Sequence, residues 1–277
     1  MQNVTAVVQL VTKEVSALKI RMKFSKIGPI KFIGHLDVMR YFQKAFRRAK
    51  VDVAYSKGFS PHQIISFAAP LGIGLTSEGE YLDAEFHSTD SSEVMLERIN
   101  AVMNEGITLL EYKLLPDDAK NAMSTVAAAD YEITFRPGYY NIDAFLTQVN
   151  NFLCQEQIIM TKETKKSTAE VDILPMIYEF CTINTKVADP EKMVERVALG
   201  YGLTDQALYL KVKTGSAVNL KPELVMEAFC QYLGFEYEKN GFMFHRLDTY
   251  MENAKGELVP LGAAGSEILE PMADEKE

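Results

Sequence analysis

The order in which hydrophobic periodicity changes along this chain constrains its fold more than any other feature. Residues 18–116 alternate between segments with the two-residue period of a strand and segments with the three- and four-residue spacing of a helix. The segments read in the order β-α-β-β-α-β. They are Leu18–Ile27 (strand), Leu36–Lys50 (helix), Asp52–Tyr55 and Gln63–Phe67 (extended), Glu80–Phe86 (strand), Asp90–Asn104 (helix) and Ile107–Leu115 (strand). Gly28-Pro29 predicts a turn after which Ile30–Ile33 continues the first strand, and Pro70–Gly79 predicts a connector.

The same order of patterns returns after residue 130. Its segments are Asp130–Arg136 (strand), Ile142–Cys154 (helix), Gln157–Glu163 and Glu170–Ile183 (extended), Asp189–Val197 (a short inserted helix), Gln206–Lys213 (strand), Lys221–Leu233 (helix) and Phe235–Asp248 (last strands, with a hairpin turn at Asn240-Gly241). This order is that of the ferredoxin-like arrangement, in which two helices cover one face of a four-stranded antiparallel sheet. We therefore predict an α+β chain of two tandem ferredoxin-like (βαββαβ) domains with antiparallel sheets, related by a diverged duplication.

Segments without an apolar period mark the expected domain limits. We expect an N-terminal extension over residues 1–17, a first domain over 18–116 and a second over 130–250. Residues 117–129 are small and polar and predict a linker. Residues 251–277 are rich in Gly, Ala and Glu and predict a disordered acidic tail.

Cysteine and histidine usage argues against a disulfide framework and against a metal site. Cys154, Cys181 and Cys230 are widely spaced in apolar segments, which is typical of reduced, buried thiols in a cytoplasmic protein. No two histidines have the spacing of metal ligands. The apolar runs are too short to cross a membrane, and the first residues make a poor signal peptide. We expect a cytoplasmic protein that works without a membrane, metal or cofactor.

Positive charge is concentrated between Arg21 and Phe67. This stretch holds ten Lys or Arg residues and two Asp, whereas the whole chain carries a net charge of −9. The stretch is therefore +8 and the rest of the chain is −17. A low isoelectric point, near 5.1, argues against indiscriminate binding of nucleic acid but leaves room for one local basic surface.

The predicted helix Leu36–Lys50 has one apolar and one basic side. Met39, Phe42, Phe46 and Ala49 recur at helical spacing, and the basic residues fall nearly opposite them. The basic set is Arg40, Lys44, Arg47 and Arg48. A solvated face of an ordinary amphipathic helix remains an alternative, but such a face usually mixes both signs of charge.

A polar, glycine-containing loop follows this helix. Its residues Tyr55, Ser56, Lys57, Phe59 and His62 include hydroxyls, a cation and aromatic rings that suit a phosphate or another polar ligand. Gly58 permits a positive φ and Pro61 fixes its own φ, so the loop has a defined shape. Tyr55 and Phe59 remain open to the alternative that they are ordinary core residues.

The residues of this region resemble the radical SAM-linked protein family, uncharacterised bacterial proteins classed as a domain of unknown function. The resemblance rests on Phe32–Arg40 (F-x-x-H-L-D-x-M-R), Arg47-Arg48-Ala49, Tyr55–His62 (Y-S-x-G-F-x-P-H), Ile65-Ser66-Phe67 and Glu80–Asp83 (E-Y-L-D). It covers roughly residues 18–245. The resemblance implies a radical SAM protein as a partner, because members are fused to one or encoded beside one. The chain itself lacks the C-x-x-x-C-x-x-C motif of a radical SAM cluster.

Two functions are compatible with these residues. We favour an accessory binding protein that presents an RNA or ribonucleoprotein to a radical SAM enzyme. The binding candidates are Arg40, Lys44, Arg47, Arg48, Tyr55, Ser56, Lys57, Phe59 and His62. The alternative is a metal-independent ribonuclease that uses His35, His62 and Lys57, provided that the loop folds back over the helix N-terminus. A purely structural docking subunit is a third possibility, and Asp83 and Glu85 are expected to serve in salt links inside the first domain.

Overall fold

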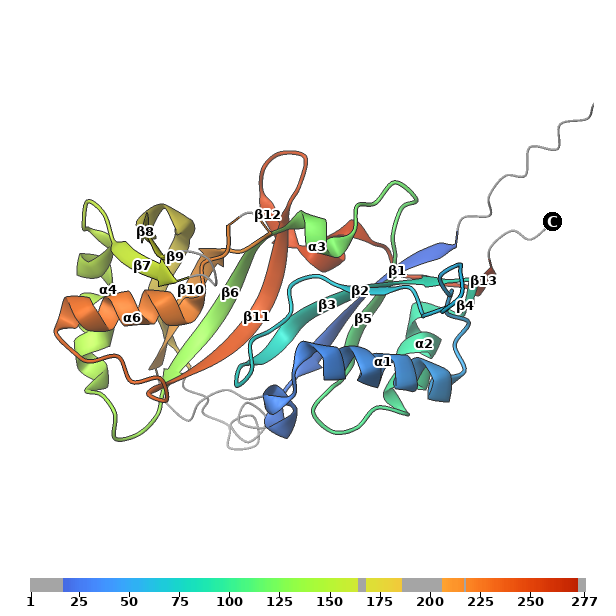
Figure 1. Cartoon of the computed structure of the whole chain (residues 1–277), viewed down its shortest axis with the longest axis horizontal. Helices are drawn as coiled ribbons and strands as arrows, with labels where there is room; N and C mark the ends of the chain where they lie inside the picture. Colours follow the sequence, from blue (N-terminus) through green and yellow to red (C-terminus); the bar gives the residue numbers. More distant parts are fainter. Residues whose placement is uncertain (1–16, 164–167, 186–205, 217, 274–277) are drawn as a thin grey trace, which may run out of the picture.

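One continuous β-sheet runs through the protein, and the longer helices pack against it (Figure 1). The computed structural model describes residues 17–163, 168–185, 206–216 and 218–273. The nine-stranded sheet has the order β5-β1-β3-β11-β6-β10-β9, with β2 paired to β3 and β12 paired to β11. The α+β class is therefore confirmed.

The first half of the chain contributes four strands to this sheet and two helices that pack against it. Its elements are β1 (Leu18–Lys26), η1 (Gly28–Phe32), α1 (His35–Ala49), β2 (Ile65–Phe67), β3 (Thr76–Phe86), β4 (Ser88–Thr89), α2 (Ser92–Asn100) and β5 (Leu109–Leu114). The spatial order is β5-β1-β3-β2, so the first strand lies between the third and the last of the four.

The second half repeats this spatial order. Its elements are α3 (Ala122–Thr125), β6 (Val126–Phe135), α4 (Ile142–Leu153), β7 (Ile159–Glu163), β8 (Thr168–Asp172), η2 (Leu174–Met176), β9 (Ile177–Asn184), β10 (Gln206–Lys213), α6 (Pro222–Leu233) and β11 (Phe242–Glu252). The order β11-β6-β10-β9 again places the first strand between the third and the last. The chain ends with β12 (Leu258–Pro260), η3 (Leu261–Ala264) and β13 (Met272–Ala273).

Each half has its own apolar core between helices and sheet. In the first half, Phe42 and Phe46 of α1 and Met95 of α2 pack on alternate residues of β1 and β3. In the second half, Phe145 of α4 and Phe229 of α6 pack on β6, β9 and β10. Successive side chains of a strand point to opposite faces of the sheet, so every second residue is buried under the helices. This burial explains the two-residue apolar period of the strand segments in the sequence.

The two halves share their sheet through β3 and β11, which pair in parallel. Thr76 pairs with His245 and Ser77 with Arg246. Gly79 is required at this contact, because a Cβ at this position would lie 2.3 Å from the Cα of Asp248. The prediction of two separate antiparallel sheets is therefore wrong: the halves form one mixed sheet.

The predicted linker is part of the folded structure. Residues 117–129 include α3 and the first four residues of β6, and Ala122, Ala128 and Ala129 are completely buried. Ala122 packs with Tyr81 and Leu261 in a small apolar cluster. These alanines gave no visible period in the sequence because they are small, yet the same size lets them fit under larger neighbours.

The chain after β11 is also ordered where the structure describes it, so the predicted disordered tail is wrong for residues 252–273. Leu261 is completely buried and Ile268 nearly so. Ser266 exchanges two backbone hydrogen bonds with Leu114, and β13 pairs with β4. This segment, here called the C-terminal strap (residues 253–273), ties the end of the second half onto the first half (Figure 1).

Several smaller predictions also differ from the structure. Residues 28–32 form the 3₁₀ helix η1 rather than a strand continuation, because Gly28 and Pro29 start a helical turn that ends at Ile33. The strand β3 begins at Thr76, inside the predicted connector. Residues 238–241 form a turn, but only one long strand, β11, follows it. The predicted extension 1–16 and inserted helix 189–197 lie outside the described residues.

Candidate functional site

Helix α1 separates an apolar side from a basic side, as its sequence predicts. Val38, Phe42, Phe46 and Ala49 are buried, and Met39 is partly buried against the same core. Arg40, Lys44, Arg47 and Arg48 are all exposed. At about 100° per residue, the centre of the basic set lies nearly opposite the buried set. The cations therefore form a solvent-facing strip along α1.

Local interactions hold the arginines of this strip without using up their donors. Arg40 pairs with Asp37 at 3.2 Å, with both side chains largely exposed. The Nε of Arg47 donates to the carbonyl of Gln43, and Arg48 donates to the carbonyl of Val102 at 2.8 Å. A guanidinium carries five N–H groups, so each arginine keeps several for a ligand.

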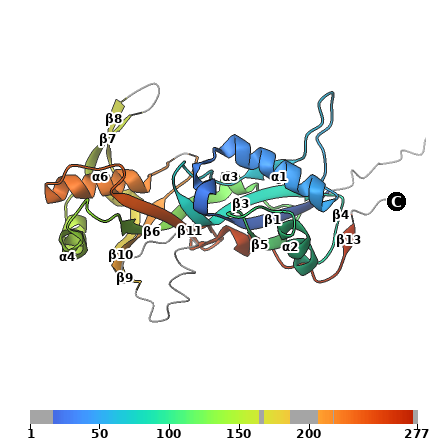
Figure 2. The same ribbon diagram turned by 90° about the horizontal axis from the view of Figure 1, so that it is seen from below.

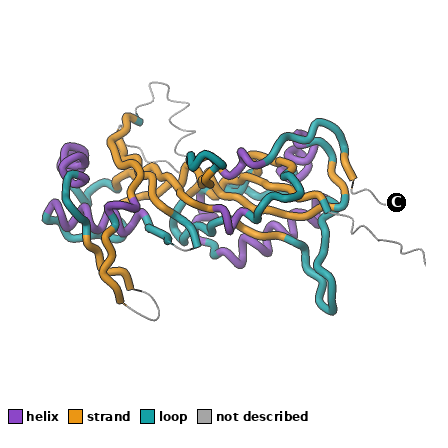
Figure 3. The backbone as a smooth tube through the Cα atoms, turned by 90° about the horizontal axis from the view of Figure 1, so that it is seen from above, coloured by secondary structure: helices purple, strands orange, loops and turns teal. Residues whose placement is uncertain are grey.

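The loop Tyr55–His62 projects from the first half beside α1 (Figures 2 and 3). Its two ends are joined by the Ser56 N–H, which donates to the carbonyl of His62 at 2.8 Å. The Ser56 Oγ and the His62 Nδ1 lie 2.9 Å apart, and the His62 N–H donates to the same Oγ. Gly58 has a φ of 116°, which favours glycine. These bonds give the loop a fixed base below an exposed tip.

The tip of this loop presents an aromatic ring to solvent. Phe59 is fully exposed, and Tyr55 is about half exposed. Lys57 and His62 are exposed beside them. Both aromatic residues are therefore surface residues, and the alternative that they belong to the core is wrong.

The carbonyl oxygen of Gln43 connects the loop to the basic strip. It accepts hydrogen bonds from the Nε of Arg47 at 3.3 Å and from the side-chain amide of Gln63 at 3.4 Å. The same amide of Gln63 donates to the hydroxyl of Tyr55 at 3.3 Å. The base of the loop therefore lies beside Gln43 and Arg47 on α1. The exposed cations of α1 and the exposed cation, histidine and aromatic residues of the adjoining loop are here called the basic surface (Arg40, Lys44, Arg47, Arg48, Tyr55, Lys57, Phe59 and His62).

His35 lies elsewhere. It occupies the first turn of α1, where its ring contacts Phe67 edge-on with 5.1 Å between centroids. The loop joins α1 at Gln43, eight residues further, which corresponds to about 12 Å along the helix. The condition for the ribonuclease alternative, a loop folded over the helix N-terminus, is not met. His35 therefore lies in the first turn of α1, whereas His62 lies at the base of the loop, which joins α1 near Gln43.

A buried polar cluster between the two apolar cores was not predicted. Arg246 of β11 pairs with Glu80 of β3 at 2.9 Å, and both side chains are about 6% exposed. Lys26 of β1 is buried next to them and donates to the carbonyl of Ile33 at 3.0 Å. Together with Glu80 and Phe67, Lys26 and His35 line a small hollow. The sequence contains a sign that Lys26 is buried, because Lys26 follows Ile20, Met22 and Phe24 at the two-residue spacing of the core-facing side of β1.

Burial shifts the proton affinities of this cluster. Desolvation lowers the pKa of Lys26 and of His35, although the nearby carboxylate of Glu80 opposes the change in both. The pKa of Arg246 is raised, because the ion pair with Glu80 and the contact with Tyr131 outweigh the cost of burial. The ion pair of Arg246 with Glu80 links the second half of the chain to the first half. Each buried charge depends on the other, because removal of one partner would leave the remaining charge buried without compensation.

The remaining sequence expectations concern acids, thiols, metals and membranes. Asp83 forms the expected salt link inside the first half, with Arg21. Cys230 is buried and Cys181 is only partly buried, but Cys154 is exposed, so the expectation of buried thiols is confirmed for Cys230 and wrong for Cys154. Among the residues described, no three His, Cys, Asp or Glu side chains gather as metal ligands would. No helix within the described ranges is long and apolar enough to cross a membrane.

Comparison with family models matches residues 19–222 to a family described as "Uncharacterized protein conserved in bacteria (DUF2344)". The match spans β1 through the first residue of α6 and so includes α1 and the whole basic surface. No curated protein matches the chain.

Proposed function

Since the chain belongs to the DUF2344 family of uncharacterised bacterial proteins, whose description states no activity, we propose its function from the basic surface. We propose an accessory binding protein that presents an RNA or a ribonucleoprotein to a separate radical SAM enzyme. In this proposal the RNA contacts α1 and the loop Tyr55–His62.

The observation that carries this proposal is the shared carbonyl of Gln43. Because Arg47 and Gln63 both donate to it, the base of the loop that carries Phe59 lies beside Arg47, one of the four exposed cations of α1. Phosphates need the cations, and unpaired bases need a ring on which to stack. The rest of the chain carries a net charge of −17 and repels a polyanion elsewhere.

The geometry of the loop favours unpaired nucleotides over a duplex. Phe59 is fully exposed at the tip, so its ring is open to solvent. Stacking of a base on such a ring contributes about 1–3 kcal/mol. A base inside a duplex is already stacked, so only a single-stranded or looped segment gains this contact.

The order of strands in the two halves supports the RNA proposal by analogy. Both halves place their four strands in the order last-first-third-second with two helices on one face. We propose that they are ferredoxin-like units related by duplication. Pairs of such units recur in RNA-binding and RNA-processing proteins, although a fold alone does not fix a function.

The radical SAM partner enters the proposal through the resemblance of Phe32–Arg40 and Tyr55–His62. In this account the partner supplies the iron–sulfur cluster, because the sequence contains no C-x-x-x-C-x-x-C. The protein would hold the substrate, and the partner would perform the chemistry in the cytoplasm.

Filter binding of a bulk cellular RNA pool at several salt concentrations tests the proposal. If about four cations each neutralise one phosphate, log K falls with log salt at a slope near −3, at roughly −0.7 per contact on a single strand. Phe59→Ala should weaken binding by about 5–150-fold, the equivalent of one lost stacked base. Phe59→Trp should retain binding.

Two controls make this test specific. Tyr139 is an aromatic residue outside the basic surface and is about half exposed, as Tyr55 is, so Tyr139→Ala should leave binding unchanged. Incubation of the RNA with the pure protein in EDTA should leave the RNA intact, whereas cleavage would favour the ribonuclease alternative. Failure of the wild type to retain RNA at low salt would contradict the proposal and favour a purely docking role.

A further inference from the structure

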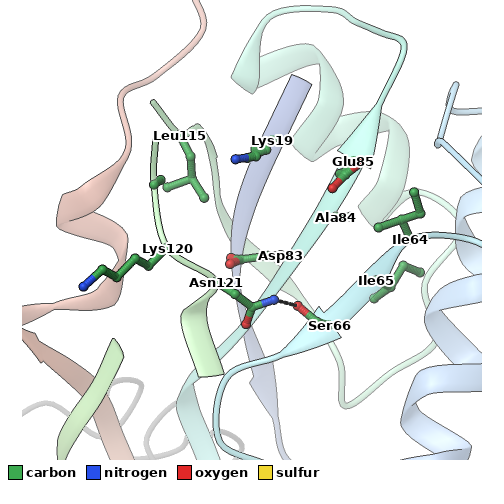
Figure 4. Close-up of a pocket in the computed structure, with 11 residues that line it drawn as sticks. Lys19, Ile64, Ile65, Ser66, Asp83, Ala84, Glu85, Leu115, Lys120 and Asn121 are labelled. Carbon is green, nitrogen blue, oxygen red and sulfur yellow. Dashed lines mark hydrogen bonds between the residues drawn. The ribbon is translucent and has the colours of Figure 1, made fainter. Parts of the chain in front are cut away.

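A separate pocket lies on the face of the sheet opposite α1 and α2 (Figure 4). Its volume is about 210 Å³, and its polar lining includes Lys19, Glu85 and Ser66. Lys19 and Glu85 alternate along their strands with Ile20, Ala84 and Phe86, whose side chains belong to the helix-covered core. The pocket therefore opens on the other side of the sheet, away from the basic strip of α1.

Lys19 and Glu85 are opposite each other across β1 and β3 but do not form an ion pair. They are register partners, and such neighbours normally lie close enough to attract each other. The Nζ of Lys19 instead donates to the carbonyl of Asp117. Within the part of the chain that the structure describes, no side-chain hydrogen bond or ion pair of Glu85 is found. The pocket thus holds Lys19, which has spare donors, and the unused carboxylate of Glu85, whereas the side chain of the other lining lysine, Lys120, points away from Glu85 (Figure 4).

The other acid of the pocket is fully occupied. Asp83 accepts two hydrogen bonds from Arg21, at 2.8 and 2.9 Å, and a third from the N–H of Ala122. Asn121 donates to the hydroxyl oxygen of Ser66 at 2.7 Å, as Figure 4 shows. The hydroxyl hydrogen of Ser66 remains to be donated. Glu85, Lys19 and Ser66 therefore keep hydrogen-bonding capacity for a ligand.

The walls between these groups are apolar. Ile64 lies on one side and Leu115 on the other. Small-molecule sites commonly combine apolar walls with a few polar groups that fix orientation. The volume of about 210 Å³ is well above what one water needs and leaves room for a small organic ligand.

We propose that this pocket binds a small zwitterion, an aliphatic α-amino acid or a molecule of the same chemistry. Its ammonium group pairs with the carboxylate of Glu85. Its carboxylate accepts hydrogen bonds from Lys19 and Ser66, and its aliphatic side chain contacts Ile64 and Leu115. Two opposite charges held apart on neighbouring strands match the two opposite charges that such a ligand carries.

The pocket adjoins the root of the loop Tyr55–His62 through the backbone of Glu85. The carbonyl of Glu85 accepts from the N–H of Ala54 at 2.7 Å, and its own N–H donates to the carbonyl of Ile64 at 3.2 Å. These two residues flank the loop on either side. Binding in the pocket needs no RNA, so this inference stands independently of the proposed function.

Titration of the ¹⁵N-labelled full chain with L-leucine, followed by nuclear magnetic resonance, tests the proposal. The amide signals of Ile64, Ser66 and Glu85 should shift with a saturable dependence on leucine concentration. Isopentylamine lacks the carboxylate and 4-methylpentanoate lacks the ammonium group, so each should bind at least tenfold more weakly. Glu85→Gln should also reduce the affinity for leucine at least tenfold.

A matched variant controls for changes of charge. Glu97 is an exposed glutamate of α2 on the other side of the sheet, so Glu97→Gln should bind leucine as the wild type does. A circular-dichroism melt shows whether Glu85→Gln is folded. The proposal is overturned if leucine causes no saturable shift at these amides. Equal binding by Glu85→Gln, or by either single-charge analogue, would overturn it as well.

Discussion

At the scale of single residues, the two sides of α1 predict opposite responses to truncation. Phe46 is completely buried and packs edge-on against Phe42 and Phe86, with centroid distances of 6.0 and 5.9 Å. Phe46→Ala should therefore lower the free energy of unfolding by about 3–5 kcal/mol. Arg47→Ala, on the exposed side, should cost less than about 0.5 kcal/mol. Urea denaturation measures both, and a larger loss for Arg47→Ala would refute the assignment of the two sides.

His35 predicts how stability responds to acid. Because burial lowers its pKa below the ordinary value of 6.5, the unfolded chain binds a proton at a pH where the native protein does not. Stability therefore falls as the pH drops through about 6.5, and the fall ends below the native pKa. Urea denaturation at pH 7.5 and pH 5.5 should show a smaller acid loss in His35→Gln than in the wild type. His62→Gln is the control, and an unchanged acid loss in His35→Gln would contradict the account.

At the scale of elements, the C-terminal strap predicts a contrast between two leucines. Leu261 is completely buried against Tyr81 and Ala122, whereas Leu269 is 84% exposed. Leu261→Ala should cost about 2–5 kcal/mol of unfolding free energy, and Leu269→Ala less than about 0.5 kcal/mol. Chemical denaturation of both variants measures the difference. Equal and small effects would restore the expectation of a disordered tail.

Elements with a sustained apolar period could be predicted from the sequence, and those without one could not. The helices α1, α4 and α6 begin and end within one residue of the predicted ranges, because several large apolar residues repeat in each. The strap and α3 have only isolated apolar residues among small or charged ones. Their structure depends on contacts with distant residues such as Tyr81 and Leu114, and no local pattern reports such contacts.

At the scale of the whole molecule, the joining of the two halves could not be predicted for a related reason. The parallel pairing of β3 with β11 brings together residues about 170 positions apart, and only the inward-facing charges of Lys26, Glu80 and Arg246 hinted at it. The members of the basic surface were visible in the sequence as cations and as loop residues. Their common location was not visible, because it depends on Gln43 and Gln63, which belong to no motif.

If polyanions bind this acidic protein at the basic surface, a charge-reversal comparison can separate the effect of local charge from that of net charge. One variant changes Lys44, Arg47 and Arg48 of the basic surface to Glu. The matched control changes three exposed lysines elsewhere, Lys221, Lys239 and Lys255, to Glu, so that both proteins have the same net charge.

Filter binding of a bulk cellular RNA pool at low and moderate salt compares these two proteins with the wild type, after circular-dichroism melts confirm that all three are folded. The account predicts that reversal on α1 abolishes RNA retention, while the control retains RNA nearly as well as the wild type. Equal losses in both variants would show that only net charge matters, and retention by the α1 variant would contradict the basic surface as the binding site.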